Sequence, residues 1–191
     1  MLKIEENVPI RNLVTMRIGG PARFVISVTE KEDIPKAYKF AVEHNLPVCI
    51  LGGGANTFAK DQGFNGVILL DKIIGIEQVA KDSLEDIILG KEEAKFDKNT
   101  LYRIAYFKAY GGEQWDDLVT YVSERGYSGI EAMAGIPGTA GAAPVQNIGA
   151  YGQEVTQVIV SVDAYDVKLD KFVTIPADEM KMSYRKSIFD S

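Results

Sequence analysis

Residues 135–152 read GIPGTAGAAPVQNIGAYG, and this stretch constrains the fold more than any other part of the chain. Its five glycines are interleaved with alanines, and Tyr151 is its only ionisable side chain. Glycine lets a backbone adopt unusual conformations or approach a ligand closely. Backbone N–H groups and the start of a helix could therefore hold a polyphosphate, while Gln146 and Asn147 could form hydrogen bonds with polar groups along the edges of the ligand. The alternative is a tightly packed crossing of small residues between two lobes.

A second glycine-rich turn, LGGGAN, occupies residues 51–56 at the end of an apolar run. Without side chains in the way, successive N–H groups can converge on an anion. A plain flexible turn explains the motif equally well. The spacing matches neither G-x-x-x-x-G-K-[ST] nor G-x-G-x-x-G, so the sequence gives no support to nucleotide triphosphate hydrolysis.

The first part of the chain predicts a βαβ unit. The run ARFVISV at residues 22–28 has strand composition, and TEKE at residues 29–32 has the spacing of a helix capping box. Apolar residues then recur at helical spacing before a second strand at residues 48–51 and a buried strand at residues 67–70. The helical positions are Ile34, Ala37, Tyr38, Ala41 and Val42.

The later part predicts short strands, at residues 86–89 and 101–110 among others, separated by a charged, solvated loop at residues 91–99. A helix should follow residue 112, with Trp115 as a core anchor on the same face as Leu118, Val119 and Val122. Gly126 should end this helix. A strand at residues 155–165, with a possible partner at residues 172–175, should close the chain.

Composition excludes several classes of protein. The 191 residues carry a formal net charge of −6 without a basic stripe, which argues against nucleic acid as a partner. No apolar run is long enough to cross a bilayer, so a soluble cytoplasmic protein is expected. Cys49, the single cysteine, is expected to be a buried strand residue, and His44, the single histidine, to close a helix.

Five segments together resemble the UDP-N-acetylenolpyruvoylglucosamine reductases, within the FAD-binding fold shared with vanillyl-alcohol oxidase-type flavoproteins. They are TMRIGGPA at residues 15–22, LGGGAN at 51–56, GGEQWDDLV at 111–119, GIEAMAGIPGTAGAAPVQNIGAYGQEV at 129–155 and SYRKSIF at 183–189. The fourth segment is the most specific of them.

The resemblance implies an α+β fold of two lobes, residues 1–72 and 73–191, that hold FAD without a covalent link. NADPH would reduce the flavin, and UDP-N-acetylglucosamine enolpyruvate would become UDP-N-acetylmuramate. Arg185 matches the family's active-site arginine, and Tyr184 beside it would either face the substrate or pack. The implied cofactor-binding residues are Gly52, Gly53, Gly54, Ala55 and Asn56 in the first loop, and Gly135, Ile136, Pro137, Gly138, Gly141, Ala142, Gln146, Asn147, Gly149, Ala150, Tyr151 and Gly152 in the second.

The family also carries a C-terminal substrate domain with a serine proton donor and a late glutamate. Ser187 and Glu154 belong to other parts of the family pattern and should not take those roles. The 191 residues are therefore expected to be incomplete for catalysis, with the substrate domain removed or separate. Two alternatives are a flavin-binding module without turnover and a flavin subunit of a larger oxidoreductase.

Overall fold

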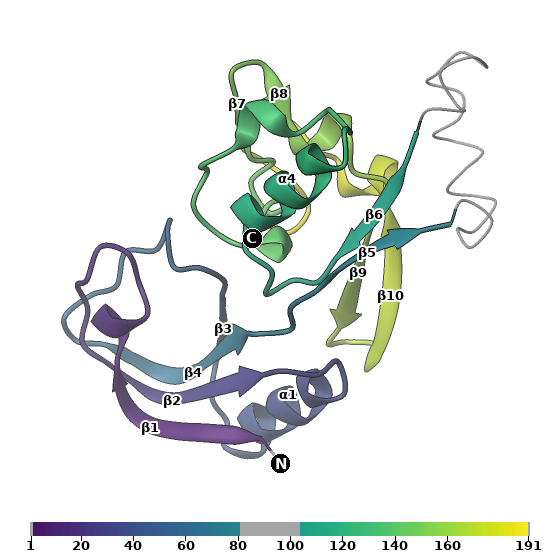
Figure 1. Cartoon of the computed structure of the whole chain (residues 1–191). Coiled ribbons are helices and arrows are strands. Elements are labelled where there is room, and N and C mark those ends of the chain that lie inside the picture. The colour runs from purple at the N-terminus through teal and green to yellow at the C-terminus, as the bar shows by residue number, and fades with distance from the viewer. Residues whose placement is uncertain (1, 81–103, 191) are drawn as a thin grey trace.

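The structure is a computed structural model that describes residues 2–80 and 104–190 (Figure 1). Its N-terminal part is a four-stranded sheet in the order β1-β2-β4-β3, in which β2, β4 and β3 run parallel and β1 pairs antiparallel with β2. The elements are β1 (Lys3–Pro9), β2 (Pro21–Val28), α1 (Asp33–Glu43), β3 (Val48–Leu51) and β4 (Phe64–Asp71). The predicted βαβ unit is therefore present, with β4 inserted between its two strands.

Successive residues of β2 face two different cores, as the two-residue period of a strand requires. Val25 packs with Ile10 and Val14 of the N-terminal turn on one face. Ile26 packs with Ala37 and Ala41 of α1 on the other. The sheet is thus buried on both sides, and the N-terminal turn is fixed against it.

Three details of the N-terminal part differ from the sequence-based expectations. Helix α1 begins at Asp33 and makes no side-chain cap hydrogen bond, so the predicted capping box at residues 29–32 is wrong. Val42 is 73% exposed because it lies on the solvent side of α1. Cys49 is exposed because β3 is the edge strand of the sheet. His44 is the C-cap of α1, as expected.

The described residues of the C-terminal part form small antiparallel strand pairs and the helix α4. Trp115, Val119 and Val122 of α4 are buried, and Gly126 follows the helix with a φ of +80°, as predicted. The indole Nε1 of Trp115 donates to the Met133 carbonyl at 2.9 Å, which confirms its core role. The elements are β5 (Ile76–Val79), β6 (Tyr106–Ala109), α4 (Trp115–Glu124), β7 (Gly149–Ala150), β8 (Gln153–Glu154), β9 (Ser161–Asp166) and β10 (Lys171–Pro176).

Short 3-10 turns connect these elements, at Ile10–Asn12, Glu131–Met133, Ala140–Ala142, Val155–Gln157 and Ala177–Met180. The predicted strand at residues 155–165 is correspondingly too long. Its first residues form a 3-10 turn with a capping box between Glu154 and Gln157, and β9 begins only at Ser161. The predicted strand at residues 101–110 is described from residue 104 and is a strand only in β6, whereas the expectations for residues 86–89 and 91–99 lie outside the described residues.

The hydrophobic core clusters fall into two groups that draw on different parts of the chain. The clusters beside the first sheet contain residues up to Leu70, whereas the cluster around α4 contains residues from Phe107 onward. Side chains join the two parts where the ring of Tyr38 in α1 packs at a tilt against that of Tyr165 in β9, with ring centroids 5.7 Å apart. A lobe boundary at residue 72 stays a prediction, which this separation of cores supports. Within the described residues, no helix is long and apolar enough to cross a membrane.

Candidate functional site

The fold brings the two glycine-rich stretches into direct contact. The loop at residues 52–56 follows β3 and lies against residues 138–146 of the other stretch. A Cβ atom added to Gly53 would lie 3.0 Å from the Gly138 Cα. The amide Nδ2 of Asn56 donates to Oε1 of Gln146 at 2.9 Å. Residues separated by 90 positions in the sequence therefore form one surface.

The N-terminal turn holds the first loop from the other side. The N–H of Thr15 donates to the Gly54 carbonyl at 3.1 Å. Gly54 has a φ of +66°, and a Cβ atom at this position would collide with the Leu13 carbonyl oxygen. Only glycine satisfies both the backbone conformation and the close approach.

The backbone N–H groups of residues 52–56 make the first loop suited to an anion. None of these five groups donates to an acceptor in the described part of the chain. Gly54 is nevertheless buried, and buried N–H groups without an acceptor are rare in folded proteins. A run of unpaired donors at one turn can be satisfied by the oxygens of a phosphate group.

The glycines of the second stretch have two different structural roles. Gly141 crosses Gly111 at close range, with its N–H donating to the Gly111 carbonyl at 3.0 Å, so there is no room for a side chain. Gly135, Gly138 and Gly152 instead have positive φ values and face open space. Close packing of backbone against backbone therefore accounts for glycine at position 141, and likewise at position 53 of the first loop. Gly135, Gly138 and Gly152 instead leave open surface along the second stretch.

Asn147 is buried within the second stretch, and its side chain forms hydrogen bonds with other groups of the protein. Its Nδ2 donates to Oε2 of Glu154 at 2.9 Å and to the Ser183 carbonyl at 3.1 Å. Its Oδ1 accepts from the Thr156 N–H at 3.0 Å. The side chain thus fixes the loop, and its predicted contact with a cofactor stays a prediction.

The remaining predicted cofactor residues lie along the same stretch. Gly149 and Ala150 form β7, and Tyr151 follows at the tip of its hairpin, 95% exposed. Ile136 packs partly against the core around α4, whereas Pro137 and Ala142 are exposed. Their contacts with a cofactor also stay predictions.

The segment SYRKSIF lies against the second stretch. Nη2 of Arg185 donates to the Gly149 carbonyl at 3.4 Å, and the guanidinium is otherwise exposed. Tyr184 is 78% exposed. Ser187 Oγ donates to the Val145 carbonyl at 2.7 Å and accepts from the Phe189 N–H, so its hydroxyl has a structural role.

A half-buried carboxyl group lies where the two parts of the chain meet. Asp71 ends β4, and a Cβ atom on Gly111 would collide with its carboxylate. Its Oδ1 accepts from the Ile73 N–H at 3.0 Å. Burial outweighs that hydrogen bond and raises the pKa of Asp71 above its ordinary value.

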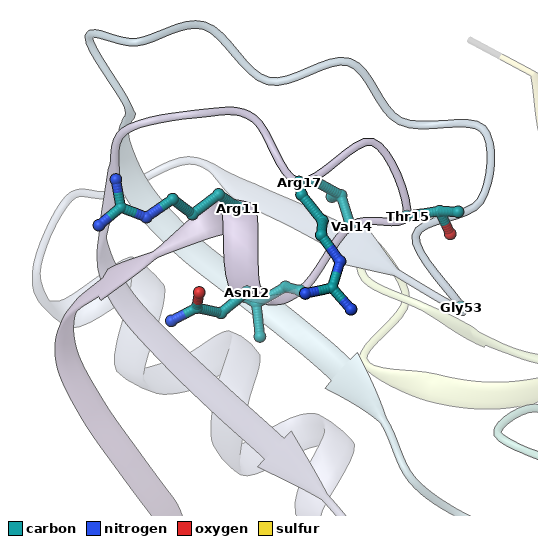
Figure 2. Close-up of a pocket in the computed structure, with 7 residues that line it drawn as sticks. Arg11, Asn12, Val14, Thr15, Arg17 and Gly53 are labelled. Carbon is teal, nitrogen blue, oxygen red and sulfur yellow. The ribbon is translucent and has the colours of Figure 1, made fainter.

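A pocket of about 480 Å³ opens beside the first loop (Figure 2), lined by residues 11–15, Arg17 and Gly53. The role of Arg17 in this wall has no signal in the sequence. The segment TMRIGGPA contains Arg17, but nothing in its spacing indicates that the chain returns to residue 53. Among the described residues, no cluster of His, Cys, Asp or Glu could hold a metal ion.

Comparison with known proteins shows which proteins this chain is similar to. Residues 96–169 match the family described as FAD binding domain. The sequence is 38% identical over 95% of its length to the UDP-N-acetylenolpyruvoylglucosamine reductase of Streptomyces avermitilis, and 35% identical over 99% to that of Ralstonia nicotianae. The chain matches the FAD-binding region of UDP-N-acetylenolpyruvoylglucosamine reductases. It spans 43% and 50% of the lengths of these two relatives.

Solved structures support the same fold. The crystal structure of UDP-N-acetylenolpyruvylglucosamine reductase from Thermus caldophilus matches 98% of the chain with a TM-score of 0.71 at 21% identity, and the chain covers 57% of it. A solvent-stable cholesterol oxidase matches 91% of the chain with a TM-score of 0.54 at 14% identity, and the chain covers 32% of it. The fold is therefore the α+β, two-lobed FAD-binding fold of the vanillyl-alcohol oxidase type, as the sequence predicts.

Proposed function

We propose that this chain is the FAD-binding part of an enzyme that reduces UDP-N-acetylglucosamine enolpyruvate to UDP-N-acetylmuramate with NADPH. Such an enzyme would work in the cytoplasm, in peptidoglycan precursor synthesis, and thereby serve cell shape and division. The observation that carries the proposal is the meeting of the two glycine-rich stretches, where residues 52–56 offer five unpaired N–H groups. The similarity to the reductases covers both stretches.

These residues offer FAD backbone hydrogen-bond donors and open surface. The N–H groups of residues 52–56 would hold the diphosphate, and the open surface at Gly135, Gly138 and Gly152 would follow the rest of the cofactor. Neither stretch contains Cys or His, two of the residue types that could attach a flavin covalently. The cofactor should therefore be bound without a covalent link.

Arg185 and Tyr184 would serve the substrate. When bound, the flavin supplies hydride transfer. The guanidinium of Arg185 is exposed beside Gly149, where its forked N–H donors could pair with a substrate carboxylate and with the negative charge that develops as the substrate is reduced. Tyr184, largely exposed next to it, could contact the same substrate.

Titration of the purified 191-residue protein with FAD tests the proposal. The protein should turn yellow, release free flavin on denaturation and gain about 2.7 kcal/mol of stability at an FAD concentration of 100 times Kd. NADPH should then bleach the bound flavin, and UDP-N-acetylglucosamine enolpyruvate should bind beside it. Well-folded protein that takes up no FAD, or flavin that stays on the precipitated chain, would contradict the proposal.

A further inference from the structure

The pocket beside Gly53 joins the N-terminal turn to the first glycine-rich loop. Residues 11–15 and Arg17 form most of its wall, and Gly53 completes it. The turn is fixed to the loop because the Thr15 N–H donates to the Gly54 carbonyl at 3.1 Å. The backbone of Arg17 is held within the turn, since its N–H donates to the Val14 carbonyl at 3.1 Å. A ligand held by residues 52–56 would therefore lie next to this wall.

The two arginines of the pocket differ in direction. In Figure 2 the side chain of Arg17 reaches into the space between Asn12 and Gly53, whereas that of Arg11 extends the opposite way. Neither guanidinium makes an ion pair or a side-chain hydrogen bond within the described part of the chain. Arg17 thus brings an uncompensated positive charge close to the first loop.

A diphosphate needs such a charge. Backbone N–H groups carry only partial charges, and neither residues 51–56 nor residues 135–152 contain a lysine or an arginine. The whole chain has a formal net charge of −6, so its overall field opposes an anionic ligand. A guanidinium supplies full charge and forked donors that match phosphate oxygens.

We propose that Arg17 binds the diphosphate of the ligand held by residues 52–56 and thereby selects FAD over flavins without phosphate. The proposal rests on the proposed function, since it assigns the diphosphate of that same cofactor. Arg11 lines the same pocket but directs its charge elsewhere, so it serves as a matched control.

The test compares Arg17→Gln, Arg17→Lys and Arg11→Gln in the 191-residue chain, with circular dichroism to check folding. FAD and riboflavin are titrated separately by flavin fluorescence. Arg17→Gln should weaken FAD binding roughly 10- to 100-fold, the usual effect of losing a charge-assisted hydrogen bond, and leave riboflavin binding unchanged. Arg17→Lys should restore part of the loss, and Arg11→Gln should change FAD binding less than about 3-fold.

Several outcomes would overturn the role of Arg17. Equal losses in Arg17→Gln and Arg11→Gln would indicate only the general field of the protein, and equal losses of FAD and riboflavin would indicate a structural effect. A wild-type protein that binds no FAD would instead overturn the proposed function. In that case the binding of inorganic pyrophosphate tests the role of Arg17 by itself. Weaker pyrophosphate binding by Arg17→Gln than by Arg11→Gln supports this role, and equal binding by the two variants rejects it.

Discussion

Asn147 shows how a single side chain fixes the second glycine-rich stretch. It is 2% exposed, and its three hydrogen bonds reach Glu154, Ser183 and Thr156. Asn147→Ala would remove all three hydrogen bonds, leave the Thr156 N–H without its acceptor and put alanine at a φ of +42°, so we expect a loss of about 3 kcal/mol. Urea unfolding measures it. Asn65→Ala, which removes one exposed 3.5 Å hydrogen bond, should cost under about 0.5 kcal/mol, and equal effects would contradict this account.

Asp71 should make the stability of the protein depend on pH. Burial raises its pKa above the ordinary 3.8, so the folded state holds the proton more tightly than the unfolded chain. The neutral carboxyl therefore favours folding at low pH, and this advantage is lost as the pH rises through the folded-state pKa. Asp71→Asn keeps an acceptor for the Ile73 N–H and stays neutral. Relative to wild type, the variant should become progressively more stable in urea unfolding as the pH rises above 3.8, and a difference that stays constant with pH would contradict the assignment.

The crossing of Gly141 over Gly111 positions one loop against the other at the scale of elements. A Cβ atom on Gly141 would lie 2.8 Å from the Gly111 Cα and 2.9 Å from its carbonyl oxygen, and neither backbone atom can move freely. Gly141→Ala should therefore cost about 1 to 3 kcal/mol and move residues 138–146 away from residues 52–56. Weaker FAD binding is the expected consequence, measured by titration.

Gly126→Ala provides the control for this prediction. Gly126 has a φ of +80° and no neighbour within 4 Å of the added Cβ, so the substitution costs backbone strain of about 1 to 2 kcal/mol away from both loops. Its FAD affinity should equal that of wild type. If Gly141→Ala binds FAD as tightly as Gly126→Ala does, the crossing does not set the position of the loop.

Periodic and local signals made most elements predictable from the sequence. The alternation in β2 and the apolar face of α4 each depend on neighbouring residues, so the pattern alone identifies them. The apolar run around Cys49 predicts a buried residue, because such a run does not reveal that β3 lies at the edge of the sheet. The predicted start of α1 is also wrong, since no cap at residues 29–32 is formed.

The same distinction, between features with a local sequence signal and contacts without one, applies to the candidate site. Glycine-rich motifs identified both loops, but their contact through Asn56 and Gln146 spans 90 residues and has no local signal. The same holds for Arg17, which lines one pocket with Gly53 because the N-terminal turn packs against the loop that follows β3. From the sequence, close packing of glycines and binding of a ligand are alternatives, whereas in the structure Gly53 contributes both to the packing of the loops and to the wall of the pocket.

At the scale of the whole molecule, we expect the proposed reaction to need more than the described residues provide. Reduction of the substrate needs a proton as well as a hydride, and Arg185 cannot supply it because its guanidinium stays protonated. Ser187 and Glu154 are both occupied, the first by the Val145 carbonyl and the second by Asn147. The chain also spans only 43% of the Streptomyces avermitilis reductase.

A polypeptide of residues 1–191 should therefore bind FAD but reduce UDP-N-acetylglucosamine enolpyruvate very slowly. Loss of a positioned general acid typically costs about 100- to 10,000-fold in rate, and poorer positioning of the substrate adds to the deficit. NADPH consumption with substrate measures the rate, first for the polypeptide alone and then for a fusion to the C-terminal part of a relative. FAD affinity should be the same in both, so that a rate recovered in the fusion reports the added proton donor and the better positioning of the substrate, not a change in flavin binding. Turnover by the polypeptide alone at the rate of the fusion would show that an acid within residues 1–191 completes the reaction.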